Sequence, residues 1–133
     1  MTKITDYIQQ ANGRTLFSLE VIPPLKGSSI KELLANIEPL MDFKPPFIDV
    51  TYHREEYIEQ MLPDGTVKHI VTRKRPGTLG ICSSIMHKFG VDAVPHVLCG
   101  GFSREETEDF LMDLHYLGID NVLVLRGDPA KPY

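Results

Sequence analysis

The chain contains no tryptophan and only two cysteines among its 133 residues. Cys82 and Cys99 form neither a metal-ligand spacing nor a disulfide framework, so we expect a reduced protein with two free thiols. The N-terminus lacks the apolar core of a signal peptide, which predicts a cytoplasmic location. No apolar run approaches the roughly 20 residues of a membrane span, so no membrane association is expected.

Positive charge is also scarce, and the usual catalytic motifs are missing. The net charge of −4 provides no basic surface for nucleic acid. The five histidines include no close pair with zinc-ligand spacing, so no metal site is expected. Neither a nucleophile elbow nor a complete phosphate-binding or dinucleotide-binding fingerprint occurs. Function must therefore be sought in the arrangement of the predicted strands.

Apolar strands and amphipathic helices alternate along the chain, whose length suits one domain. The predicted strands are Leu16–Val21, Phe47–Tyr52, Ala93–Cys99 and Asn121–Asp128. The first predicted helix is Thr5–Ala11, capped by Thr5 or Asp6, and the second is Ile30–Met41, with a break near Pro39. The third runs from Thr78 to Gly90, and the fourth from the capping box Ser103–Glu106 to Gly118. Such repeated strand–helix units indicate an α/β protein with a parallel sheet. Two architectures fit: a doubly wound sheet, or the first four units of a (β/α)₈ barrel, which needs about 250 residues.

The segment at about 53–78 is predicted to be an irregular insertion. Glu55–Leu62 is interpreted as a helical turn or a mobile segment, while the turn signal at Pro63-Asp64-Gly65 favours a small hairpin arm at Val67–Val71. The basic run Arg73-Lys74-Arg75 is either a solvated loop or an anion contact.

Polar residues occur where each predicted strand ends, and this is the edge at which parallel sheets bind ligands. Each has a structural explanation by itself, such as an ion pair or a satisfied core histidine, but their coincidence on one edge favours a site. Glu20 is costly to ionise within an apolar strand, so it lies at a wet end or in a site that keeps its proton. Gly100-Gly101-Phe102-Ser103 is a plain turn and cap or a phosphate cradle. The edge residues are Glu20, Thr51, Tyr52, His96, Arg126, Gly127 and Asp128.

Four motifs in order resemble the methylenetetrahydrofolate reductase family: Phe17-Ser-Leu-Glu-Val-Ile-Pro-Pro24, Asp49-Val-Thr-Tyr52, Pro95-His-Val-Leu-Cys99 and Leu125-Arg-Gly-Asp128. The resemblance implies a barrel flavoprotein of one-carbon metabolism and methionine biosynthesis. Such enzymes reduce 5,10-methylenetetrahydrofolate to 5-methyltetrahydrofolate by ping-pong hydride transfer from NADH or NADPH through FAD. The sequence does not choose between the two nicotinamide donors.

The resemblance also implies roles for individual residues. Glu20 is expected to be the general acid that helps to open the folate ring, and Asp128 to lie near the flavin and the folate, where its charge favours a cationic iminium. Thr51 is expected near the nicotinamide or the folate. The expected FAD contacts are Tyr52, His96, Arg126 and Gly127, with Asp128 beside the flavin ring.

Two departures from the family pattern affect these expectations. His53-Arg54-Glu55 follows Tyr52 where many members have small residues, and the chain stops after the fourth strand. A half-barrel would have open edges and an uncovered apolar face. We therefore expect a homo-oligomer that is inactive in isolation. The alternatives are a non-catalytic, self-associating fragment without FAD, and a small doubly wound binding domain whose resemblance is accidental.

Overall fold

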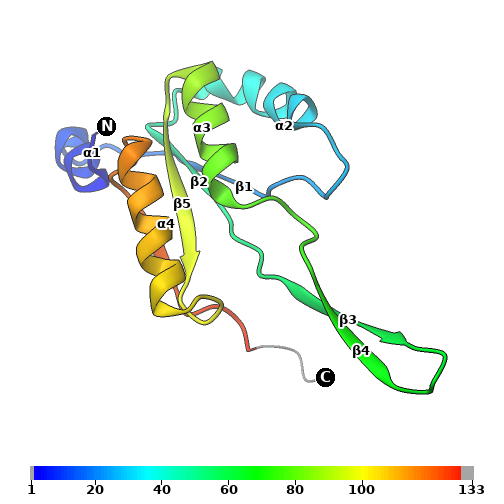
Figure 1. Cartoon of the computed structure of the whole chain (residues 1–133). Coiled ribbons are helices and arrows are strands. Elements are labelled where there is room, and N and C mark those ends of the chain that lie inside the picture. Colours follow the sequence, from blue (N-terminus) through cyan, green and yellow to red (C-terminus); the bar gives the residue numbers. More distant parts are fainter. Residues whose placement is uncertain (1, 130–133) are drawn as a thin grey trace.

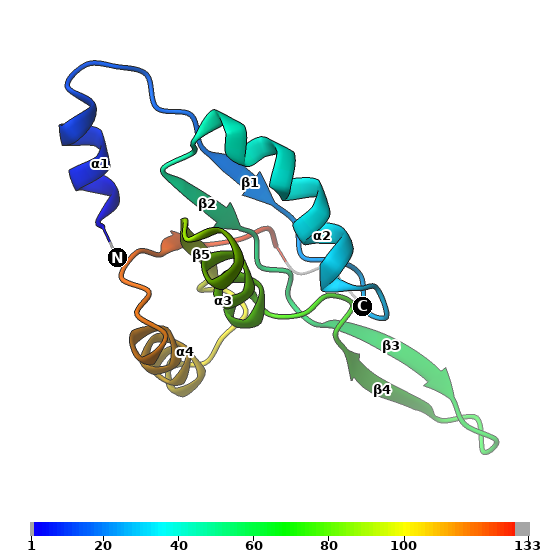
Figure 2. The ribbon, with the colours of Figure 1, turned by 90° about the horizontal axis from the view of Figure 1, so that it is seen from above.

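The computed structural model describes residues 2–129, and Figures 1 and 2 show their arrangement. The elements follow one another as α1 (Ile4–Ala11), β1 (Leu19–Val21), α2 (Ile30–Ile37), η1 (Glu38–Phe43), β2 (Phe47–Val50), β3 (Glu56–Met61), β4 (Val67–Thr72), α3 (Thr78–Phe89), β5 (Asp92–Leu98), α4 (Arg104–Tyr116) and β6 (Leu123–Leu125). Within these residues no helix is both long and apolar enough to cross a bilayer.

The main sheet has the order β1-β2-β5-β6, and all of its neighbouring strands are parallel. The predicted α/β class with a parallel sheet is therefore confirmed. Strand order follows chain order without reversal, whereas a doubly wound sheet reverses direction at a switch point. Successive right-handed crossovers in one direction place their helices on the same face. The winding therefore runs in one direction, as it does in a (β/α)₈ barrel.

The core lies between this sheet and its helices. Alternate residues of β2, Ile48 and Val50, are fully buried against α3, where Ile81 and Ile85 supply the facing side chains. Leu114 of α4 belongs to the same buried cluster. In Figure 1, α3 and α4 lie on the viewer's side of β5. The opposite face of the sheet therefore carries the other half of each strand's side chains.

Helix α1 closes the amino end of the sheet. The Tyr7 hydroxyl donates to Asp92 Oδ2 at 2.5 Å, and the Ile4 amide donates to Asn121 Oδ1 at 3.0 Å. The prediction that Thr5 or Asp6 caps this helix is wrong, because the cap position is Lys3 and makes no side-chain hydrogen bond. The side-chain carbonyl oxygen of Asn121, two residues before β6, accepts from the Ile4 amide and takes the place of a local capping side chain.

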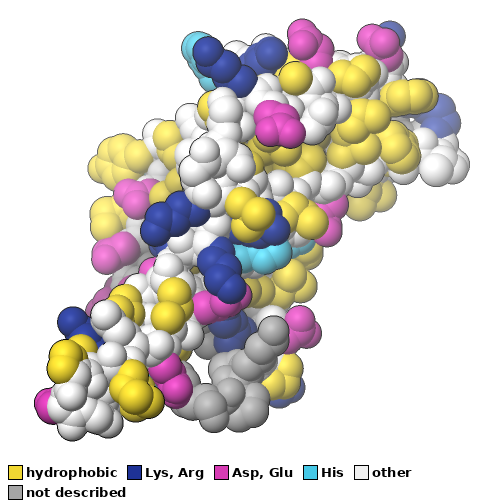
Figure 3. All heavy atoms as spheres, turned by 90° about the vertical axis from the view of Figure 1, so that its right-hand side faces the viewer, with side chains coloured by type: hydrophobic (Ala, Val, Ile, Leu, Met, Phe, Trp, Pro, Cys, Tyr) yellow, Lys and Arg dark blue, Asp and Glu magenta, His cyan; other side chains and the backbone are white. Residues whose placement is uncertain are grey.

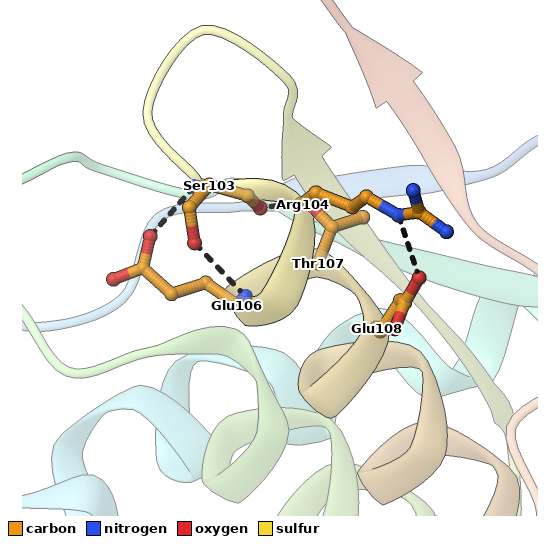
Figure 4. Close-up of polar contacts among 5 residues, drawn as sticks. All are labelled: Ser103, Arg104, Glu106, Thr107 and Glu108. Carbon is orange, nitrogen blue, oxygen red and sulfur yellow. Dashed lines mark hydrogen bonds and ion pairs between the residues drawn. The ribbon is translucent and has the colours of Figure 1, made fainter.

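Two other helix signals are confirmed. Ser103 accepts from the Glu106 amide at 3.1 Å, and the Glu106 carboxylate accepts from the Ser103 amide at 2.7 Å, which is the predicted capping box (Figure 4). Pro39 follows the last residues of α2, and the chain continues as the 3₁₀ helix η1. The proline has no amide to continue the α-helical pattern.

Two strand predictions need correction. The predicted strand Leu16–Val21 pairs only at Leu19–Val21, and the preceding residues are exposed. The strand predicted at Asn121–Asp128, the most apolar by sequence, pairs only at Leu123–Leu125, and these three residues are exposed, whereas Val122 before them packs against the core. It is the edge strand of the sheet in the described part of the chain, so hydrophobic sequence alone does not bury it.

The segment at 53–78 contains a hairpin arm formed by β3 and β4. All six residues of β3 pair antiparallel with β4, so Glu55–Leu62 does not form the predicted helical turn. The hairpin expected around Val67–Val71 is confirmed as β4. Asp64 makes the turn by accepting from both the amide and the hydroxyl of Thr66. Figures 1 and 2 show the arm projecting away from the body.

Candidate active site

Three titratable side chains meet on the sheet face opposite the helices. Glu20 of β1 is the register partner of Asp49 of β2, and His96 of β5 lies two residues beyond Asp49's own partner, Val94. His96 Nε2 is 3.4 Å from Asp49 Oδ1 and 3.8 Å from Glu20 Oε2. Exposure of these side chains is 4% for His96, 18% for Asp49 and 60% for Glu20. The cluster thus runs from a buried imidazole to an open carboxylate.

The buried part of this cluster is electrostatically costly. Burial raises the pKa of Asp49, while His96 opposes the rise and the nearby Glu20 carboxylate adds to it. His96 Nε2 is buried, and its 3.4 Å approach to Asp49 Oδ1 is an ion-pair contact rather than a well-formed hydrogen bond. A buried polar nitrogen without a well-formed hydrogen bond is typical of a site that has a function or receives a ligand. The Glu20 side chain is the accessible end at which a ligand would enter.

Thr51 and Tyr52 follow β2 at the same edge. The Thr51 amide donates to Val21 O at 3.1 Å, and its hydroxyl lies 3.0 Å from His53 Nε2. Tyr52 packs edge-on against Phe102, with ring centroids 5.0 Å apart. Burial raises the pKa of the Tyr52 phenol, and the charge of Arg73 opposes the shift. Tyr52 therefore presents a neutral, half-buried ring.

Arg126, Gly127 and Asp128 follow β6 and line a wide groove of about 1750 Å³, together with Tyr52. Gly127 has φ +80°, and a Cβ there would lie 2.8 Å from Arg54 Nη2. The guanidinium of Arg54 therefore occupies the space that a side chain at position 127 would need. The groove is larger than the roughly 300–1,000 Å³ of typical small-ligand pockets, so it can accept an extended cofactor.

The structure separates the predicted site residues into two groups. Glu20 and His96 share the charged cluster, whereas Tyr52, Arg126, Gly127 and Asp128 line the groove. Thr51 follows β2, and its hydroxyl contacts His53, which also lines the groove.

Sequence reasoning missed Asp49 and Arg54 as site residues. Asp49 carries the same signal as Glu20, a carboxylate inside an apolar strand, and could have been found by it. Arg54 gives no local signal, because only the fold brings its guanidinium to Gly127.

The Gly100–Ser103 segment forms the turn and cap that precede α4. Ser103 uses its hydroxyl to cap α4, which is the plain turn-and-cap interpretation of the Gly100–Ser103 segment. A Cβ at Gly100 would lie 2.9 Å from the Arg126 carbonyl oxygen, so this glycine permits close strand-end packing. In residues 2–129 no group of three His, Cys, Asp or Glu side chains could hold a metal ion.

A barrel-type parallel sheet with acid, imidazole and arginine groups at its carboxyl edge defines an α/β protein with a ligand site in the position usual for enzymes. The family model for methylenetetrahydrofolate reductase matches residues 3–132, so this chain belongs to that family. The resemblance predicted from the four strand motifs is thereby confirmed.

Curated relatives show how much of the family's length the chain covers. It is 28% identical over 121 residues to 5,10-methylenetetrahydrofolate reductase of Pectobacterium carotovorum, covering 91% of this chain and 35% of the relative. It is 29% identical over 129 residues to the probable methylenetetrahydrofolate reductase (NADH) of rice, covering 96% and 19%. A probable NADPH-type reductase of Caenorhabditis elegans is 29% identical over 112 residues, covering 84% and 15%. The chain therefore spans about a third or less of these proteins.

Proposed function

We propose that the chain contributes to an oxidoreductase that reduces 5,10-methylenetetrahydrofolate to 5-methyltetrahydrofolate, with FAD as hydride carrier and NADH or NADPH as donor. The observation that carries the proposal is the cluster of Glu20, Asp49 and His96 at the strand ends of a family member. Relatives are named for both nicotinamides, so the donor stays open.

The residues at the edge suit a flavin. The groove offers an aromatic wall at Tyr52, a cation at Arg126, a side-chain-free backbone at Gly127 and a carboxylate at Asp128. The buried Nε2 of His96, which contacts Asp49 without a well-formed hydrogen bond, adds a polar group that a ligand could satisfy. Tyr52, His96, Arg126 and Gly127 would hold FAD, which when bound supplies reversible hydride chemistry.

The chain's own residues would handle the proton and the charge. Glu20 is exposed and can reach a bound folate, where it would donate a proton to the ring nitrogen that leaves as the imidazolidine opens. Asp128 would place negative charge beside the cationic iminium, and Thr51 would contact the nicotinamide or the folate.

The first test of this proposal is flavin retention. The chain is soaked in FAD, desalted and examined for visible flavin absorbance, followed by bleaching with NADH or NADPH. Glu20→Gln should retain flavin to the same extent and lose most folate reduction. Glu32→Gln on the exposed side of α2, away from the groove, is the matched control and should change neither property. Full folate reduction in Glu20→Gln would refute the role of Glu20.

Self-association is a second proposal, favoured by one observation. Leu123, Val124 and Leu125 of edge strand β6 are 40%, 58% and 38% exposed, and burying them would be favourable. The full (β/α)₈ barrel proposed for the family would cover β6 with a fifth strand–helix unit, and a second copy of this chain could do the same. Light scattering over a wide concentration range should show a dimer or larger species, and a monomer throughout would contradict this.

A further inference from the structure

Arg54 is one of three consecutive residues at which this sequence departs from the family pattern, and it lines the groove. It lies two residues before β3, where the arm leaves the body. A Cβ at Gly127 would lie 2.8 Å from Arg54 Nη2, and a Cβ at Gly100 would lie 3.5 Å from the same atom. These glycines follow β6 and β5, respectively. The guanidinium therefore lies against the ends of two strands, at points where the backbone carries no side chain.

The guanidinium of Arg54 lacks a protein partner in the part of the chain that the structure describes. It forms neither an ion pair nor a hydrogen bond with any of residues 2–129. The arginines at the other end of the arm differ, because Arg73 lies 3.8 Å from Glu55 and Arg75 Nη1 donates to Pro23 O at 2.5 Å. The solvated-loop interpretation of the basic run therefore does not describe Arg75. A partly buried arginine whose donors lack such partners is typical of a site that receives an anion.

Backbone donors lie beside this guanidinium. Among the described residues the amides of Gly100 and Gly127 donate to no acceptor, whereas the neighbouring Cys99 amide donates to Leu125 O at 2.9 Å. Because neither glycine has a side chain, a ligand can approach these amides and the guanidinium together. Backbone amides and guanidinium groups are the donors that bind phosphate oxygens in proteins. The strand ends and Arg54 thus offer the donors that a phosphate group needs.

The charges of Arg54 and Arg126, which both line the groove, are not compensated by side chains of residues 2–129. The carboxylates that follow Arg54 in sequence, Glu55 and Glu56, pair with the basic run instead. Figure 3 views the chain from the side toward which the arm projects, and Lys and Arg side chains gather in the middle of that face, next to a histidine. Two uncompensated guanidinium groups in one groove favour a ligand that carries more than one negative charge.

The cofactors of the proposed function carry such a group. FAD and the nicotinamide dinucleotides each contain a diphosphate, and the contacts proposed above give it a single cation, Arg126. Tyr52, proposed to contact the flavin, is two residues before Arg54, so their Cα atoms are at most about 7 Å apart. A dinucleotide that contacts Tyr52 can therefore bring its diphosphate to Arg54.

We propose that Arg54 binds the diphosphate of a dinucleotide cofactor in the groove, with its planar fork donating to phosphate oxygens beside the amides of Gly100 and Gly127. The inference rests on the proposed function, because that function supplies the dinucleotide. Arg54 makes the groove prefer a cofactor with a diphosphate over the same ring without one. Because many family members have small residues at this position, the contact is a feature of this chain.

The experiment compares FAD with riboflavin, which has the same ring system and no phosphate. Each flavin is titrated with the chain, and the change in flavin fluorescence gives the affinity. Arg54→Gln should weaken FAD binding about tenfold and leave riboflavin binding unchanged. Arg54→Lys should recover part of the loss, because lysine keeps the charge without the fork. Arg104→Gln, at the exposed start of α4 and outside the groove, is the matched control and should alter neither affinity.

A second titration distinguishes the two dinucleotides. NAD⁺ and nicotinamide mononucleotide, which lacks the diphosphate, are added to the chain after it has been loaded with FAD. If Arg54→Gln weakens NAD⁺ alone and leaves FAD unchanged, the diphosphate at Arg54 is that of the nicotinamide dinucleotide. A loss confined to FAD assigns the site to the flavin cofactor.

Two results would overturn the assignment. One is equal affinity of Arg54→Gln and Arg104→Gln for both FAD and NAD⁺. The other is equal weakening of FAD and riboflavin in Arg54→Gln, since Arg54 would then act on the ring and not on the diphosphate. Circular dichroism confirms that each variant folds.

Failure of the proposed function gives a different pattern. A chain that binds neither flavin is tested with inorganic pyrophosphate by calorimetry. Pyrophosphate binding that Arg54→Gln removes supports the site and counts against the proposed function, whereas no pyrophosphate binding overturns the site. A chain that holds FAD through Arg54 but reduces no folate counts against the proposed function alone.

Discussion

The body and the arm are both β structure, yet different forces hold them. Strands β2 and β5 are largely buried, and helices pack against them, whereas nearly every residue of β3 and β4 is exposed. The body is stabilised by burial of apolar surface. The arm depends on its ladder, its turn and surface ion pairs such as Lys74 with Glu56. Because isolated two-stranded hairpins are marginally stable, the arm should open without unfolding of the body.

The largest expected difference comes from the same substitution in both regions. Ile85→Ala removes a fully buried side chain of α3 and should lower the free energy of unfolding by about 2–5 kcal/mol. Ile58→Ala in the arm, where the side chain is 50% exposed, should lower it by less than about 0.5 kcal/mol. Urea unfolding followed by circular dichroism measures both. Equal losses would mean that the arm belongs to the cooperative core.

Two glycines with nearly the same backbone angle give the next comparison. Gly65 in the arm has φ +82° and open space around it, so Gly65→Ala should cost about 1 kcal/mol from backbone strain alone. Gly127 in the body has φ +80°, and its Cβ would meet Arg54 and Leu98, so Gly127→Ala should cost about 1 kcal/mol more. Thermal unfolding measures both. Adding Arg54→Ala to Gly127→Ala should recover part of the loss, and no recovery would show that Arg54 does not fill that space.

A buried thiol links the stability of the body to alkaline pH. Burial, aided by the charge of Asp49, raises the pKa of Cys82 from 9.0 to about 12. The unfolded thiol ionises first, so the folded state binds more protons in this window and stability falls as pH rises. From about pH 8 to about pH 10, the chain should lose about 1 kcal/mol more than Cys82→Ala. Urea unfolding measures the free energy of unfolding at both pH values. Equal losses for the unsubstituted chain and Cys82→Ala would show that the thiol is exposed to solvent in the folded state.

The smallest expected effect is on the stability of the arm, and it disappears at acid pH. The hydroxyl and amide of Thr66 hold the pKa of Asp64 below its usual value, so this contribution is present at neutral pH and is lost as pH falls. Asp64→Ala should speed hydrogen exchange of β3 and β4 amides at neutral pH, and the difference from the unsubstituted chain should shrink in acid. Amides of β5 should be unchanged. Faster exchange in β5 as well would mean that the arm and the body open together.

Local signals predicted much of the body. The capping box at Ser103 and the helix end at Gly90 depend on neighbouring residues, and both were found from sequence. The arm was predicted only in part, because the exposed strand Glu56–Met61 has charged and apolar residues without a period that distinguishes strand from helix. Pairing with β4, rather than local propensity, makes it a strand.

For the candidate site, local sequence was enough to find the polar residues that follow the strands and the motifs shared with the family. Glu20, Asp49 and His96 become neighbours only through the strand order, and Arg54 meets Gly127, and Arg75 the loop after β1, only in the folded chain. Side-chain chemistry and local propensity are properties of adjacent residues. Burial, charge compensation and close approach depend on segments that lie tens of residues apart and meet only when the sheet forms.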